Sequence, residues 1–570
     1  MPYIGRSSNF AVRSVFTYTP SAGDTSVSGA DVDGKILNFI DGRYAEVYLN
    51  GVKLKLGTDY NTNTADTIAG LTALAANDEV EVVVYDSFNV SDTVSATQGG
   101  GFSGSIFSNT LGTNNTNFGR NAGDSIASGG QYNVTIGDEA GTAITTGDYN
   151  IAVGFDAGKA ITTGSQNTFI GSQTGTATIT GHDNVAVGAF SLRINTEGAN
   201  SVAVGYSALE NQNAATATDM FNVAVGFKAG EAISTGVKNV IIGGLAGDGA
   251  QTIDESVIIG YGAGTAVMTG HDNTIVGASA GAVIAAGHSN VIVGKGAADA
   301  ATTPEDCVVI GFDAVGTGVM TGNANLAVGK DAGAALTSGH SNNFIGKDAG
   351  QATTEGTYNV AIGVDALATN VDGDGQVAIG YEALKTSEPA NGQTYNVAVG
   401  YQAAKGVTTG HSNTIIGGLT CQGALTGVSN VIIGTEAGND LTGGSNNIVL
   451  GVQALDADTN GCRSIAIGAS ALGAQNLSTV ANSYNVAVGD NAGAALTTGL
   501  SNTLIGGLAG DSLTDADNNT AVGTAALITD QLGSHSTAVG ESALRRQAFT
   551  TAAVDTYNTA VGLFLRASRL

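Results

Sequence analysis

A short pattern, Asn-x-x-(Val/Ile)-Gly, recurs from Asn115 to Gly562 and constrains this chain more than any other feature. Allowing Ser, Cys or Gln at the Asn position, there are 26 copies, and 19 of the 25 intervals between them are 17 residues long. A fixed short period over most of a chain is typical of a solenoid, in which each repeat is one coil stacked on the next. We therefore expect a long stacked structure in place of several globular domains.

Each coil has a constant pattern when its Asn position is numbered 0. Position +1 is Val, Ile or Thr in 24 of the 26 copies, with Leu326 and Asn343 as the exceptions. Position +3 is Val or Ile in 24 copies, and position +4 is always Gly. β-Branched residues two apart favour one face of a strand, and the Gly permits a bend with positive φ. Each coil is predicted to be a strand, a bend, a short second strand and a turn such as 162–164.

Position +2 lies on the opposite side of the strand from +1 and +3. We expect +1 and +3 to point into the solenoid and +2 to point outward, yet +2 is nearly always apolar, as in Ala152, Phe169 and Ile241. A strand that is apolar on both faces is covered on both faces. The outward face needs a partner, most simply identical copies of the chain. The sequence therefore predicts solenoids that associate in parallel along their length, as a homotrimer.

The Asn column predicts a second regular feature. Stacked coils place Asn above Asn, so the side-chain amides can form a hydrogen-bonded ladder. A row of Asn residues that binds a ligand is the alternative. Cys307 occupies the Asn position of one coil and is expected to be a small buried substitute. With Cys421 and Cys462 it shows neither a disulfide framework nor a metal-binding spacing.

The longer intervals follow Gly205, Gly380, Gly468 and Gly540. Their segments share an Ala-Leu pair near the start and an aromatic residue at the end: Phe221, Tyr395, Tyr484 and Tyr557. We expect loops that leave the solenoid, and exposed loops on a rigid scaffold often carry binding residues. Decoration or packing between subunits is the alternative. The candidate contacts that begin two of these segments are Tyr206 and Tyr381.

Basic residues gather near the C-terminal end of the sequence, namely Arg545, Arg546, Arg566 and Arg569. We consider two interpretations, a solvated C-terminal cap and a contact with an anionic cell-surface glycan. The chain as a whole carries a formal net charge of −28. Such an acidic surface is a poor match for nucleic acid or an anionic membrane, so neither is expected as a partner.

Residues 1 to about 95 lack the repeat. Residues 44–49 and 52–56 alternate apolar and polar side chains around Asn50-Gly51, a strong hairpin signal. Residues 79–85 are expected to form another strand. This part is predicted to be a small antiparallel, sandwich-like β domain, followed by a Gly-rich linker over 96–114.

Two resemblances extend this interpretation. The segments 47–52, 57–60 and 78–85, with the opening Met1-Pro-Tyr-Ile-Gly5, resemble small β domains of bacteriophage tail fibres. The coils 201–209 and 464–472 resemble head repeats of trimeric autotransporter adhesins, a likeness that covers most of 115–562. It implies a trimeric, left-handed parallel β-roll. The chain shows no signal peptide, heptad stalk or membrane anchor of those adhesins, which favours a virion fibre.

No motif for a nucleophile, a phosphate loop or a zinc site is recognisable, so neither an enzymatic activity nor a cofactor is expected. The six histidines precede Asn positions, and His271 and His288 on successive coils could stack. Surface turn residues are the favoured interpretation, and a shared metal across a trimer is the alternative. Asp372-Gly-Asp374 resembles a calcium loop in composition but lacks a full ligand set.

The sequence thus predicts an all-β chain with a small N-terminal antiparallel β domain and a parallel β-solenoid of about 26 coils. The expected divisions are a virion-attachment domain at 1–95, a linker at 96–114, a shaft at 115–557, and a last coil with its cap at 558–570. The expected function is that of a phage tail fibre, assembled in the host cytoplasm, that joins the virion tail or baseplate to a host-surface glycan or protein. The alternatives are a bacterial trimeric adhesin and a glycan-cleaving tailspike.

Overall fold

The structure, a computed structural model, describes residues 13–39, 42–85, 112–214, 216–388 and 392–563. The chain forms two compact units, 1–102 and 103–570. The described part is all-β apart from one short 3-10 helix, η1 (Gly42–Tyr44). The expected linker at 96–114 lies almost entirely outside the described residues.

The N-terminal unit contains two small antiparallel sheets around one apolar core. The four-stranded sheet has the order β1 (Arg13–Tyr18), β7 (Val80–Tyr85), β3 (Ala45–Leu49), β4 (Val52–Lys53). The three-stranded sheet has the order β2 (Ser26–Ser28), β6 (Thr67–Ala69), β5 (Asn61–Thr64).

The hairpin between β3 and β4 turns at Asn50 and Gly51, both with positive φ. This is the geometry that makes Asn-Gly the preferred two-residue hairpin loop. The core beneath the sheets includes Phe16, Val47 and Ile68. The expected strands at 44–49 and 79–85 are confirmed, whereas the strand after the turn is only two residues long.

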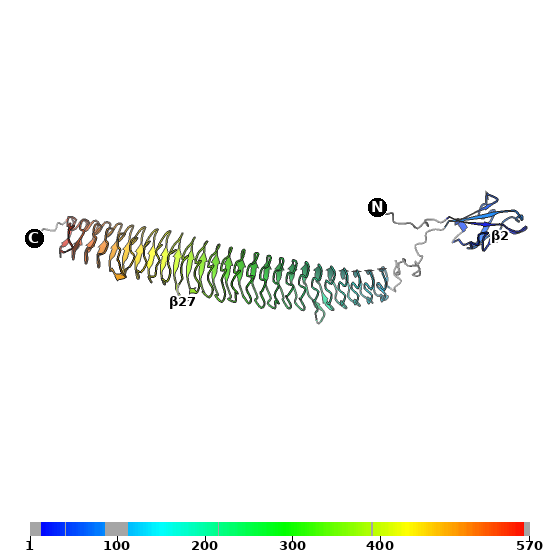
Figure 1. Cartoon of the computed structure of the whole chain (residues 1–570), viewed down its shortest axis with the longest axis horizontal. Coiled ribbons are helices and arrows are strands. Elements are labelled where there is room, and N and C mark those ends of the chain that lie inside the picture. The colour runs from blue at the N-terminus through cyan, green and yellow to red at the C-terminus, as the bar shows by residue number, and fades with distance from the viewer. Residues whose placement is uncertain (1–12, 40–41, 86–111, 215, 389–391, 564–570) are drawn as a thin grey trace. The chain divides into compact units, whose positions relative to one another are not determined.

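The solenoid consists of 26 three-residue strands, one in each coil (Figure 1). They are β8 (Thr116–Phe118), β9 (Val134–Ile136), β10 (Ile151–Val153), β11 (Thr168–Ile170), β12 (Val185–Val187), β14 (Val202–Val204), β16 (Val223–Val225), β17 (Val240–Ile242), β18 (Val257–Ile259), β19 (Thr274–Val276), β20 (Val291–Val293), β21 (Val308–Ile310), β22 (Leu326–Val328), β23 (Asn343–Ile345), β24 (Val360–Ile362), β26 (Val377–Ile379), β28 (Val397–Val399), β29 (Thr414–Ile416), β30 (Val431–Ile433), β31 (Ile448–Leu450), β33 (Ile465–Ile467), β35 (Val486–Val488), β36 (Thr503–Ile505), β37 (Thr520–Val522), β39 (Thr537–Val539) and β41 (Thr559–Val561). Neighbouring strands pair in parallel, and each residue lies beside its equivalent in the next coil.

The interior of the solenoid is formed by positions +2, +7 and +11 in most coils. In one coil these are Ala224, Ala229 and Ile233, all fully buried. Equivalent side chains stack on each other, so that Ile241, Ile258, Ile275 and Ile292 form a continuous row of buried isoleucines. One apolar cluster therefore runs through nearly all of the solenoid.

The expected orientation of the strands is wrong. Position +2 points into the core, and positions +1 and +3 point outward, as the buried Ala152 between the exposed Ile151 and half-exposed Val153 illustrates. The turns decide this orientation, because the +7 and +11 side chains they supply are on the +2 side of the strand. The argument that one apolar face lacks a cover still holds, but it applies to the +1 and +3 face.

The bend after each strand is confirmed. Gly154 has φ +138, and a Cβ there would lie 2.3 Å from the carbonyl oxygen of Gly171 in the next coil. No side chain fits between coils that approach so closely, which explains why position +4 is always Gly.

A second strand in each regular coil is not found. Three positive-φ residues, at +6, +8 and −1, break the backbone instead, as in Asp156, Gly158 and Tyr149. Each of these three residues donates its N–H to a carbonyl oxygen of an adjacent coil, at 2.9 to 3.0 Å. Left-handed backbone is unfavourable for non-Gly residues, and these inter-coil hydrogen bonds offset that cost.

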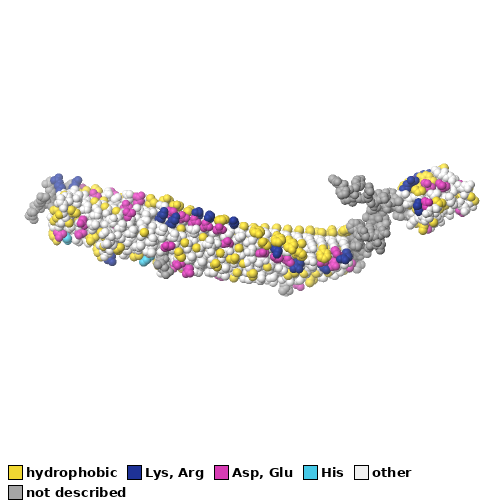
Figure 2. Space-filling model, in the orientation of Figure 1, with side chains coloured by type: hydrophobic (Ala, Val, Ile, Leu, Met, Phe, Trp, Pro, Cys, Tyr) yellow, Lys and Arg dark blue, Asp and Glu magenta, His cyan; other side chains and the backbone are white. Residues whose placement is uncertain are grey.

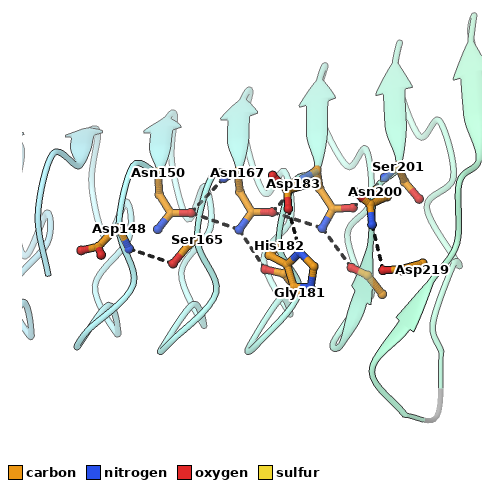
Figure 3. A network of polar contacts seen from close by, with 12 residues as sticks. Asp148, Asn150, Ser165, Asn167, Gly181, His182, Asp183, Asn200, Ser201 and Asp219 are labelled. Carbon is orange, nitrogen blue, oxygen red and sulfur yellow. Dashed lines mark hydrogen bonds and ion pairs between the residues drawn. The ribbon is translucent and has the colours of Figure 1, made fainter. Parts of the chain in front are cut away.

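The Asn ladder is confirmed (Figure 3). Asn167 donates its backbone N–H and its side-chain amide to Oδ1 of Asn150, at 3.1 and 3.0 Å. The same amide also donates to the carbonyl oxygen of Gly181, at 2.9 Å. Each buried Asn thus joins three successive coils. Cys307 is fully buried in this column, as expected.

Candidate functional site

The largest candidate surface is the outer side of the solenoid strands, which we call the strand face. It consists of the +1 and +3 side chains of the 26 coils. All of these lie within described residues, and none is Lys, Arg, Asp or Glu. The outward Ile and Val side chains are about one third exposed, for example Ile170 at 40% and Val225 at 37%. Apart from Phe118 and Asn343, this face is a stripe of aliphatic and Thr side chains that follows the whole solenoid without a charged residue.

A second candidate surface lies at the corner after the Gly bend and is formed by positions +5 and +6. Position +5 carries seven exposed aromatic residues: Phe155, Tyr206, Phe227, Tyr261, Phe312, Tyr381 and Tyr401. Two of the candidate contacts, Tyr206 and Tyr381, belong to this corner. Each stacks on the aromatic ring of the next coil, Tyr206 on Phe227 at 5.5 Å and Tyr381 on Tyr401 at 5.3 Å between centroids.

The corner also carries charge pairs, and Figure 2 shows acidic and basic side chains close together along one long edge of the solenoid. The densest network surrounds the buried Glu382. Its carboxylate accepts hydrogen bonds from Lys385 at 2.7 Å and Gln402 at 2.7 Å, and Lys405 lies 2.6 Å away. These bonds, led by the one from Lys385, lower the pKa of Glu382 to about 2. The carboxylate is charged at neutral pH and joins its own coil to the next, while Lys385 also pairs with Asp365 of the preceding coil at 2.9 Å.

The four longer coils are more than loops. Each has an extra two-residue strand near its end that pairs in parallel with an extra strand at the end of the preceding coil: β15 (Thr218–Asp219) with β13 (Gly198–Ala199), β27 (Gly392–Gln393) with β25 (Gly373–Asp374), β34 (Ala481–Asn482) with β32 (Gly461–Cys462), and β40 (Val554–Asp555) with β38 (Gly533–Ser534). The segment before this strand has exposed residues, for example Val480 before β34, which is 62% exposed. This residue therefore lies at the surface of the solenoid, as the expected loop requires.

Sequence reasoning missed a buried part of these coils. Where Ser201 replaces the ladder Asn, Gln212 fills the space, donating to Ser201 Oγ at 3.1 Å and accepting from Asn222 at 2.9 Å. Gln475 and Gln547 do the same beside Ser464 and Ser536.

In the remaining longer coil the two residue types are exchanged. Gln376 occupies the ladder position, and Ser387 donates to it at 2.8 Å. The signal was present in the sequence: a Ser or Gln at position 0 is followed by a Gln or Ser at position +11 only in these four coils. Together the two side chains replace one ladder Asn.

A buried carboxylate adjoins one of these replacements. Asp458 Oδ2 accepts from Gln475 at 2.6 Å, and its Oδ1 accepts from the backbone N–H of Gly461 at 2.9 Å. Burial raises the pKa of Asp458 above its ordinary value. Asp458 lies in the coil before a longer one, and the equivalent position in the coil before the first longer coil carries Asn195, which binds its own turn in the same way.

The basic candidates are only partly placed. Arg545 and Arg546 are exposed at the turn of the last longer coil. Arg566 and Arg569 lie outside the described residues. Tyr206 and Tyr381 lie in coils far from Arg545 and Arg546 along the solenoid, so the structure does not bring these candidates together.

The remaining polar candidates are accommodated within the turns. His271 and His288 stack, with ring centroids 5.4 Å apart; His271 is exposed and His288 is half-exposed. In the part of the chain that the structure describes, no group of three or more metal-ligating side chains is close enough to hold an ion. Asp372 and Asp374 accept hydrogen bonds from Thr354 and Thr357 of the preceding coil. The acidic loop therefore serves contacts between coils.

Comparison with known proteins adds no relationship: no family model, curated protein or solved structure matches this chain. The described residues also contain no helix that is long and apolar enough to span a bilayer. The function is therefore proposed from the surfaces of the solenoid.

Proposed function

We propose that this chain is the subunit of a trimeric viral fibre, most specifically a bacteriophage tail fibre that contacts a host cell during adsorption. In this proposal the N-terminal unit attaches to the virion tail or baseplate. The solenoid is the shaft, and its loops and corner side chains contact a host-surface glycan or protein. The protein would act as a structural component of the virion, without a catalytic step of its own.

The observation that carries the proposal is the strand face. If each of its side chains exposes about 50 Å², the face amounts to on the order of 2,500 Å² per chain, whereas the apolar patches of monomers rarely exceed a few hundred Å². A stable protein interface buries about 1,200–2,000 Å² in total, so the strand face is large enough for a permanent one. An uncharged face of this length favours association over exposure to water.

A second copy of the same chain is the partner that fits the strand face best. Only a solenoid with the same spacing of about 4.8 Å between coils can keep matching rows of side chains over 26 coils. Identical chains in cyclic symmetry offer that spacing automatically. Three copies are proposed because three such faces can enclose an axis, as the resemblance to trimeric adhesin heads also suggests.

The length of the solenoid suits a shaft. With about 4.8 Å per coil, 26 coils extend over on the order of 120 Å. The stacked ladder and core make each coil depend on its neighbours, as in other solenoids, which favours a stiff rod. A rod that separates two contact regions is the mechanical role of a fibre.

The oligomeric part is tested by sedimentation equilibrium of the native full-length protein. We expect a mass three times that of the 56.3 kDa chain. A monomeric mass that persists at micromolar concentration would contradict the assembly.

The biological part is tested by immunogold electron microscopy with antibodies against the solenoid. We expect label on virus particles, at the tail. Label confined to bacterial envelopes would instead support the surface-adhesin alternative. Release of reducing ends from purified host polysaccharide would support the glycan-cleaving alternative.

A further inference from the structure

One residue of the strand face differs in kind from all the others. Asn343 is at position +1 of β23, where its neighbours in the adjacent coils are Leu326 and Val360. The other +1 and +3 positions carry Val, Ile, Leu, Thr or Phe, so Asn343 supplies the only amide. It is exposed, and its side chain makes no hydrogen bond with a described residue of its own chain.

This amide is unfavourable whether the strand face stays in water or is covered by other chains. Asn is disfavoured within strands, and it gains nothing here from a bond inside the coil. If copies of the chain cover the face, the amide is removed from water and costs free energy unless it finds a partner. The partner must then come from another chain.

We propose that the Asn343 amides of the associated chains hydrogen-bond to one another and set the axial register of the assembly. This inference rests on the proposed trimer. In a parallel, in-register assembly around an axis, the three copies of Asn343 lie at the same height. Each amide offers two donors and a carbonyl acceptor, which is sufficient for a closed ring of hydrogen bonds.

A register device is needed because the rest of the face repeats. If one copy slides by a coil, Val, Ile and Thr meet Val, Ile and Thr again, and only the end coil loses its contacts. The slide places Asn343 of that copy against Leu326 or Val360 of its neighbours, however, which leaves its amide without a partner and opens the ring. A single buried Asn specifies register in coiled coils for the same reason.

The first experiment places a charge at this position in the full-length chain. Asn343→Asp puts three carboxylates close together if the residues meet, and no +1 or +3 position of the described coils carries a titratable group that could neutralise them. We expect at least a tenfold weaker association at pH 8 and recovery below about pH 4, measured by sedimentation equilibrium. The control is Asn446→Asp, at an exposed turn position away from the strand face.

An N343D protein with wild-type mass and affinity at pH 8 would overturn the inference. If the wild-type protein is itself monomeric, the proposed assembly fails instead. The two failures are therefore distinguishable.

The second experiment reads register directly and remains decisive if N343D does not fold. Chains with Val360→Cys and chains with Val377→Cys are co-assembled and oxidised, because a disulfide needs Cβ atoms about 3.5–4.5 Å apart and so distinguishes coils spaced by about 4.8 Å. The three native cysteines are buried. With Asn343 present we expect 360–360 and 377–377 links only. With Asn343→Val we expect 360–377 links as well, from copies displaced by one coil. Trimeric N343V protein without such links would overturn the register role.

Discussion

At the scale of single residues, the buried amide column explains how a chain with little bulk in its core holds its coils together. Many core side chains are alanine, which buries little apolar area, so hydrophobic burial per coil is small. Asn413 accepts from Asn430, donates to Asn396 and donates to the carbonyl oxygen of Gly427, at 3.0 to 3.3 Å. Each such residue satisfies buried backbone groups that water cannot reach.

Asn413→Ala should therefore destabilise the solenoid by about 1–3 kcal/mol, because it leaves the Gly427 carbonyl and the Asn430 N–H buried without their partner. The measurement is urea unfolding followed by circular dichroism. Asn482→Ala, at an exposed residue of β34, is the control and should change the unfolding free energy little. Equal effects of the two substitutions would show that the ladder bonds add no stability.

The Glu382 network predicts a pH dependence. Its folded-state pKa of about 2 lies below the ordinary value of 4.5. The charged carboxylate is therefore favoured by folding, so its contribution is present above pH 4.5 and is lost as the pH falls from about 4.5 to 2. Glu382→Gln should lower the midpoint of thermal unfolding at pH 7 and reduce its change between pH 4.5 and 2. An unchanged profile would mean that the network is not formed in solution.

At the scale of elements, the Gly bend determines how closely coils can stack. Gly243 has φ +136, and a Cβ on it would lie 2.5 Å from the Gly260 carbonyl oxygen. The adjacent Gly244 would bring its Cβ only to the ring of Tyr261, at 3.6 Å, an ordinary contact. Gly243 therefore leaves no room for a side chain, whereas its neighbour Gly244 has room for one.

Gly243→Ala is expected to cost about 2 kcal/mol or more, through unfavourable φ and the clash with the next coil. Gly244→Ala should be nearly neutral. The comparison uses the free energy of unfolding of the two full-length variants. A large loss in G244A with none in G243A would contradict the assigned bend.

The four longer coils give a test of compensation. Ser464→Gln crowds the buried site beside Gln475, and Gln475→Ser leaves a gap and unpaired groups there, so each single change should destabilise. The double variant recreates the natural Gln376–Ser387 arrangement and should recover most of the loss. A double-mutant cycle on unfolding free energies measures the coupling, and purely additive losses would argue against a shared role.

At the scale of the whole molecule, the strand face should decide whether the chain is an independent unit or part of an assembly. Val291 belongs to this face and is 37% exposed, whereas Val267 is 56% exposed in a turn. Val291→Lys should weaken association because it introduces a charge into the proposed interface. Val267→Lys should leave the sedimentation mass unchanged. If only Val267→Lys caused dissociation, the interface would lie elsewhere than on the strand face.

Much of this fold could be predicted because the local signals agree with each other. The invariant Gly, the β-branched pairs and the Asn column locate the strand, the bend and the ladder of every coil. The second strand was predicted wrongly because residues such as Tyr149 and Asp156 adopt a left-handed backbone conformation, which their residue types do not predict. Inter-coil hydrogen bonds stabilise that backbone, and they exist only once coils are stacked.

The candidate contacts were predictable to a smaller extent. Tyr206 and Tyr381 were found through the irregular intervals, but their aromatic partners Phe227 and Tyr401 are a coil away and become neighbours only through stacking. Gln212 was taken as part of an outward loop, although it is buried. A column analysis of position +11 would have identified it.

The sequence by itself determined the repeat length, the number of coils and the one strand in each, because these depend on residue types at fixed spacing. Only the tertiary structure decided which side of that strand is the inside. Positions +1, +2 and +3 are mostly apolar or Thr, so the alternation of side chains defines two faces of the strand but does not show which face is buried. The direction in which the turns close, with their +7 and +11 side chains on the +2 side, makes one face the core and leaves the other open for a partner.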